Sequence, residues 1–82
     1  MPKQEEFVNQ VELLLKRRIG AVIAGSILKN NLAKLNKDVS SMTKEDGKIL
    51  LKDVVNAVSL LVTGDESKIV GTELEKLLPM LD

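Results

Sequence analysis

The sequence predicts an all-α protein, a small helical bundle in which residues 1–82 form one domain. Apolar residues recur at alternating steps of 4 and 3 from Phe7 to Leu35, which is the spacing of one helix face. A second helical pattern of apolar residues runs from Leu50 to Val62. No stretch alternates apolar and polar residues as a half-buried strand would, so we expect no sheet.

The first expected element is one long helix from about Lys3 to Asn36. Gly20 and Gly25 weaken it, because each glycine costs about 1 kcal/mol relative to alanine inside a helix. The glycines allow two interpretations: two shorter helices, or one continuous helix whose small residues let a partner backbone approach. We favour the continuous helix, because the apolar spacing keeps its phase on both sides of the glycines.

The second expected element is a helix that begins after a polar loop at residues 36–41. Thr43 and Asp46, three residues apart, form a variant capping box that marks its start. We expect this helix to continue to about Val62. Its two apolar rows consist of Leu50, Val54, Ala57 and Leu61, and of Leu51, Val55, Val58 and Val62.

A short third helix is expected near the C-terminus. Gly64 suits the left-handed position that follows a helix, so the second helix should stop before it. Thr72 and Glu75 form a second capping box, which would open the third helix. Pro79 lacks a backbone N–H group and should end this helix near Leu78.

A faint repeat with a spacing of 20 residues relates Thr43 and Asp46 to Thr63 and Glu66. The simplest explanation is that two helices start with similar capping chemistry, and a duplicated functional unit is the less economical alternative.

The composition argues against catalysis and against bound cofactors or metals. The chain has no cysteine and no histidine, which removes disulfides, thiolate ligands and the usual general base. Residues 46–53 resemble the latter half of a calcium loop, but Met42 and Lys44 occupy the positions of the first and third ligands. We therefore expect a protein that is not an enzyme and that holds no cofactor and no metal.

The sequence also predicts a soluble cytoplasmic protein. The first six residues lack the basic and then apolar form of a signal peptide. The longest charge-free run in the first half, residues 19–28, is about half of what spans a bilayer. We expect no contact with membranes.

Opposite charges separate between the two halves of the chain, although the net charge is zero. Residues 1–37 contain seven basic and three acidic residues, a net charge of +4, and residues 38–82 contain five basic and nine acidic residues, a net charge of −4. The halves should attract each other, within one chain or between two chains.

A long first helix would be too long for the second helix to cover. It would extend roughly 45 Å, whereas the second would extend only about 27 Å. We therefore expect a non-catalytic protein–protein interaction module, a small regulator, adaptor or assembly component that forms a homodimer or a complex with another helical protein. The predicted interface consists of Phe7, Val11, Leu14, Arg18, Ala21, Gly25, Leu28, Leu32 and Leu35.

Arg18 occupies an apolar position of this spacing and has three interpretations. Its methylene groups could pack on Leu14 and Val22 while the guanidinium group reaches water. It could instead pair with an acid such as Glu12 or Asp53 and so penalise misaligned partners. A site for a ligand anion is the third interpretation.

The alternative function is that of a small dimeric DNA-binding regulator. Phosphate contacts require basic residues on one face, but the basic residues of the first helix scatter around its axis. A helix-turn-helix fitted to this region would put Asn31 at an apolar position. A bundle that holds a small apolar ligand is a third possibility. The candidate nucleic-acid contacts are Lys16, Arg17, Arg18, Lys29, Lys34 and Lys37.

Overall fold

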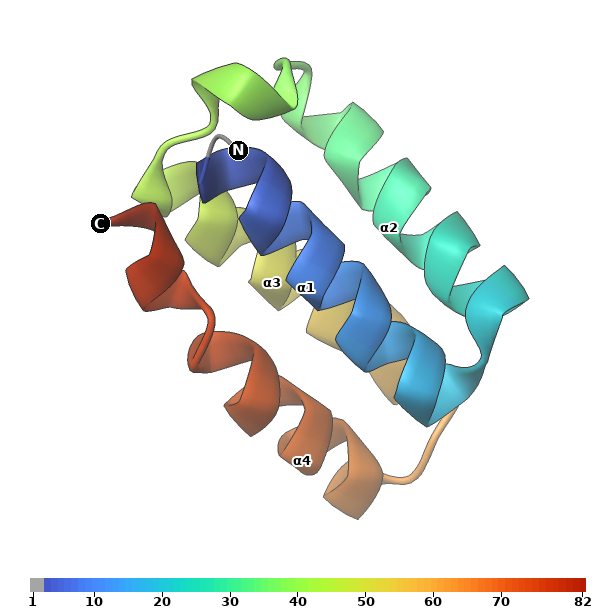
Figure 1. Ribbon diagram of the computed structural model, residues 1–82. Helices are drawn as coiled ribbons and strands as arrows, with labels where there is room; N and C mark the ends of the chain where they lie inside the picture. Colours follow the sequence, from blue (N-terminus) through green and yellow to red (C-terminus); the bar gives the residue numbers. More distant parts are fainter. Residues whose placement is uncertain (1–2) are drawn as a thin grey trace.

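The computed structural model describes residues 3–82, and these residues form four α-helices and two short 3₁₀ helices without any strand (Figure 1). The predicted all-α architecture is confirmed. The bundle measures 33 × 22 × 19 Å. The elements are α1 (Lys3–Ile19), α2 (Ala21–Leu35), the 3₁₀ helix η1 (Val39–Ser41), α3 (Lys44–Ser59), α4 (Gly64–Glu75) and the 3₁₀ helix η2 (Leu78–Leu81).

The helices run up and down, with α1 at the centre of the view in Figure 1. The second helix, α2, packs against α1 on one side, and α4 packs against α1 on the other. Behind α1 in this view, α3 contacts both α2 and α4. The α1–α2 turn and the α3–α4 loop therefore lie at the same end of the bundle, and the start of α1 and the C-terminus lie at the opposite end.

The predicted continuous helix through the glycines is wrong, because the chain reverses direction at Gly20. Its backbone has φ +87° and ψ 156°, a region that residues with a side chain hardly ever occupy. Its N–H group still donates to the carbonyl of Lys16, and its carbonyl accepts from the N–H group of Ala24. A turn of one residue leaves the spacing of apolar residues intact, so α1 and α2 present their rows to the same core.

The core is contributed by all four α-helices of one chain. Phe7 lies among the fully buried side chains, and Asn31 is the one buried amide, whose NH₂ group donates to the Ile27 carbonyl at 2.8 Å. The apolar residues that we expected a partner chain to cover are therefore largely covered by other residues of the same chain. The largest fully buried side chains are Phe7, Leu15, Leu50, Leu74, Val11, Val54, Val58 and Val70.

The capping box at the start of α3 is confirmed. The Thr43 hydroxyl accepts from the Asp46 N–H group at 3.2 Å, and the Asp46 carboxylate accepts from the Thr43 N–H group at 3.0 Å. The same carboxylate pairs with Lys37 at 2.9 Å. The hydrogen bond from the Thr43 backbone, and then the bond from Lys37, hold the pKa of Asp46 below its ordinary value.

The predicted start of the last helix is wrong. This helix begins at Gly64, where Thr63 caps it by accepting from the Glu66 N–H group at 3.2 Å, and Thr72 lies inside it. Gly64 is therefore the first residue of α4, and α3 ends at Ser59 rather than near Val62. The 20-residue repeat between Thr43 and Thr63 was the correct signal for this second cap.

Candidate interaction surface

Most of the predicted interface residues belong to the core of the chain itself. Arg18, Ala21 and Gly25 lie around the Gly20 turn, and Arg18 and Ala21 are exposed. Side chains that one chain already covers are not free for a partner, so a candidate surface has to be sought among the exposed residues. The six interface residues that are buried in the core or packed against it are Phe7, Val11, Leu14, Leu28, Leu32 and Leu35.

Arg18 pairs with two acids of α4. Its guanidinium group hydrogen-bonds to the carboxylate of Glu66 at 3.5 Å and also to that of Glu73. These acids differ from the partners considered from the sequence, and Glu12 instead lies 3.9 Å from Lys16. Arg18 therefore connects the end of α1 to α4 within one chain, in agreement with the charge attraction between the two halves.

The six basic residues of the DNA-binding alternative are all exposed, but they do not gather on one surface. Lys16, Arg17 and Arg18 lie at the end of α1, whereas Lys34 and Lys37 lie at or beyond the far end of α2, roughly 20 Å away. Three of the six (Lys16, Arg18 and Lys37) are in ion pairs with acids of the same chain.

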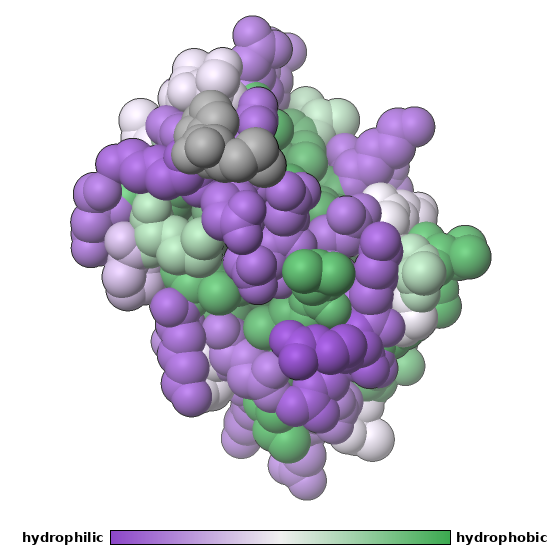
Figure 2. All heavy atoms as spheres, in the orientation of Figure 1, coloured by the Kyte–Doolittle hydropathy of each residue, from purple (hydrophilic) through white to green (hydrophobic). Residues whose placement is uncertain are grey.

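Large apolar side chains project into solvent where α2 begins and α3 ends. Val22 and Leu60 are 87% and 86% exposed, and their neighbours Ile23 and Leu61 are 45% and 56% exposed. These four residues form what we call the end patch. Figure 1 places the start of α2 and the end of α3 at one end of the bundle, and Figure 2 shows apolar atoms projecting where α2 begins.

The end patch has charges of both signs near it. Arg17 is exposed in the last turn of α1, and Asp65 is exposed in the first turn of α4. Both of these turns lie at the same end of the bundle as the end patch. An apolar centre with a mixed polar rim is the usual composition of a protein–protein interface.

A groove of about 360 Å³ between α2 and α3 continues from Leu60 toward the other end of the bundle. Ile27 and Ala57 line its apolar part, and Lys34 and Asp53 line its charged part. The surface next to Leu60 therefore continues along the α2–α3 side as a groove of mixed apolar and polar lining.

The end patch was not predicted from the sequence, because a continuous first helix would contain Val22 in its interior and a longer second helix would contain Leu61. The end patch could have been found from the correct positions of two helix ends, the start of the helix after Gly20 and the end of the helix at Ser59. A break at Gly20 and an end at Ser59 place both apolar pairs at the edge of the core.

Comparison with known protein families, curated proteins and solved structures finds no match to this chain. Within residues 3–82, no helix is both long and apolar enough to cross a membrane. The same part of the chain contains no group of three or more acidic, histidine or cysteine side chains placed to hold a metal ion.

Proposed function

We propose that this protein is a non-catalytic helical interaction module that forms a homodimer through the end patch. The observation that carries the proposal is the near-complete exposure of Val22 and Leu60 at one end of the bundle, whereas the other exposed large apolar side chains of residues 3–82 are at most 56% exposed. Burial of one such side chain is worth roughly 1.5–3 kcal/mol. Covering the four residues of the end patch would therefore contribute several kcal/mol toward the cost of association.

A second copy of the chain fits this surface better than a strongly charged partner does. The chain has no net charge, so two copies do not repel each other at long range. The four residues of the end patch are uncharged. In a dimer with two-fold symmetry, the end patch of one copy would pack against the end patch of the other. Arg17 of one copy could then face Asp65 of the other.

The surface at this end of the bundle is large enough for the area that a stable interface buries. A stable interface buries about 800 Å² on each partner, which is about a sixth of the 4979 Å² surface of the chain. The end patch supplies the apolar centre, on the order of a few hundred Å². The neighbouring rim and the α2–α3 groove supply the remainder.

The test is the mass in solution, measured by light scattering over a concentration series. Concentration must be followed by refractive index, because the chain has no Trp and no Tyr. We expect twice the 9.0 kDa of one chain at high concentration and a decrease toward 9.0 kDa on dilution. A mass of 9.0 kDa at every concentration up to the millimolar range would overturn the proposal.

Leu60→Lys and Leu13→Lys are a matched pair of variants for this test. Leu60 is in the end patch, whereas Leu13 lies on α1 and is 50% exposed. Loss of an apolar anchor at the centre of an interface should weaken dimerisation by about tenfold or more. We expect this loss with Leu60→Lys and no change with Leu13→Lys. An equal effect of both would mean that the dimer uses another surface.

A further inference from the structure

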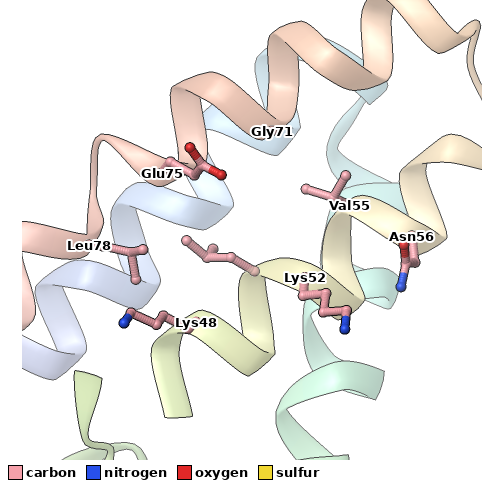
Figure 3. Close-up of a pocket in the computed structure, with 8 residues that line it drawn as sticks. Lys48, Lys52, Val55, Asn56, Gly71, Glu75 and Leu78 are labelled. Carbon is pink, nitrogen blue, oxygen red and sulfur yellow. The ribbon is translucent and has the colours of Figure 1, made fainter. Parts of the chain in front are cut away.

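A second groove lies between α3 and α4, and it shares no residue with the end patch. Its volume is about 500 Å³, which is within the range of sites that bind ligands or peptide segments. Leu51 and Val55 of α3 and Leu78 of η2 are its apolar lining residues. Figure 3 labels Val55 and Leu78 among the side chains that line it. We call this the α3–α4 groove.

The two walls of the α3–α4 groove carry opposite charges. Lys48 and Lys52 lie one turn apart on α3, and Glu75 comes from α4 (Figure 3). Lys48 is 3.4 Å from Glu45 in an exposed pair, which contributes little. Lys52 and Glu75 have no ion-pair partner within residues 3–82. One wall is therefore basic and available, and the other is acidic.

We propose that the α3–α4 groove binds an amphipathic α-helix of a partner protein, with acidic residues of that helix facing Lys48 and Lys52. Residues four apart on a helix are neighbours on its surface, so two acids one turn apart on the partner match the two lysines. From Lys48 to Asn56 the wall extends about 12 Å, which is a little over two helical turns. This length accommodates apolar anchors at positions i, i+3 or i+4, and i+7 of the partner helix.

The acidic wall favours a helix over a small anion such as a fatty-acid carboxylate. A single anionic group in the groove is attracted by the two lysines and repelled by Glu75. A helix separates its charges, because acids on one edge face α3 while the other edge offers a neutral or basic residue to Glu75. Charge complementarity therefore identifies the partner as a helix with one acidic edge.

Gly71 provides a way to fill the groove without disturbing the fold. A Cβ atom at this position would lie 3.6 and 3.7 Å from the two methyl carbons of Val55, which is ordinary van der Waals contact. A larger side chain would extend into the space that the partner helix needs. Gly71 also lies inside α4, where another residue has a higher helix propensity than glycine.

The experiment follows backbone amide signals of the ¹⁵N-labelled protein during titration with two designed helical peptides of about 16 residues. Both carry the same leucine stripe, with glutamate along one edge of the first peptide and lysine along the same edge of the second. We expect the glutamate peptide to shift the signals of residues 48–56 and 71–78. We also expect it to bind about fivefold more tightly than the lysine peptide.

Two variants separate this proposal from a nonspecific apolar contact. Lys48→Glu combined with Lys52→Glu should reverse the preference between the peptides, and Gly71→Leu should weaken both peptides while leaving dimerisation unchanged. The charge-reversal variant keeps Gly71, so it decides the question even if Gly71→Leu fails to fold. Equal affinities, no shifts with the glutamate peptide, shifts confined to the end patch, or tighter binding of decanoate than of the glutamate peptide would each overturn the proposal.

Discussion

The two ends of the bundle differ in how completely they are covered. At the end that holds the start of α1 and the C-terminus, Phe7, Met42 and Leu81 are buried, and η1 and η2 fold across the helices. We call this the closed end. At the other, open end, Val22 and Leu60 are almost fully exposed. The same small chain thus buries its apolar side chains at one end and leaves Val22 and Leu60 in solvent at the other.

The closed end is also held by contacts between distant parts of the chain. Lys3 donates to the backbone carbonyl of Asp82, and Lys44 pairs with the side chain of Asp82. Gly47 lets Leu81 pack closely against α3, because a Cβ atom at Gly47 would overlap a methyl carbon of Leu81. The open end has only the Gly20 turn and the α3–α4 loop, which leave Val22 and Leu60 almost uncovered.

Truncation of side chains at the two ends should give the largest contrast. Phe7→Ala removes a fully buried aromatic ring at the closed end and should cost about 3–5 kcal/mol of unfolding free energy. Leu60→Ala at the open end should change the stability of the monomer by less than about 0.5 kcal/mol. Urea unfolding followed by far-UV circular dichroism at low protein concentration measures both. Similar losses for the two variants would mean that the ends do not differ.

The Gly20 turn gives the next largest effect. Gly20→Ala forces a side chain into a backbone conformation that is restricted to glycine, and should cost about 1–3 kcal/mol. Gly25→Ala is the matched control, because Gly25 lies inside α2 with nothing within 4 Å of an added Cβ atom. It should stabilise the protein by about 0.5–1 kcal/mol. If both variants were stabilising, α1 and α2 would be one continuous helix.

These two glycines also show what the sequence could and could not reveal. Apolar spacing identified the buried face of α1, and capping chemistry located Thr43. Periodicity reports which side of a helix faces the core, however, and not whether the path is straight. A one-residue turn at Gly20 therefore remained hidden, and with it the end patch. The start of α4 was misplaced because Thr63 and Thr72 offer similar capping patterns, and only tertiary packing distinguishes them.

The helix cap at the closed end should be worth less than the turn. Thr43→Ala removes the hydroxyl that accepts from the Asp46 N–H group, and should cost about 1 kcal/mol. Thr72→Ala is the control, because Thr72 lies exposed inside α4 and alanine has the higher helix propensity there. We expect no loss of stability for this control in urea unfolding. A loss as large as that of Thr43→Ala would indicate that Thr72 caps a helix after all.

The same cap should make stability depend on pH. The pKa of Asp46 is lowered in the folded state, first by the backbone bond from Thr43 and then by Lys37. Its contribution is therefore complete above the ordinary value of 3.8 and is lost as the pH falls through the lowered value. Asp46→Asn should be less stable than the wild type at pH 7, and the difference should shrink below about pH 4. A difference independent of pH would contradict this account.

The ion pairs of Arg18 near the open end should have the smallest effect. Arg18 is more than a third exposed, and such pairs contribute about 0.2–1 kcal/mol. Arg18→Gln should therefore lower the unfolding free energy by about 0.5 kcal/mol at low salt, and 1 M NaCl should remove most of the difference. Arg17→Gln is the control, because Arg17 is exposed and has no ion pair within residues 3–82.

The salt dependence distinguishes the two ways in which Arg18 could act. Ion pairs with Glu66 and Glu73 are screened by salt, whereas packing of its methylene groups is not. Arg18 and Leu14 line the same recess at the surface of α1, so such packing is within reach. A loss that persists in 1 M NaCl would therefore assign the contribution to the methylene groups. In that case Arg18 would extend the apolar face of α1 toward the open end rather than fix the position of α4 by charge.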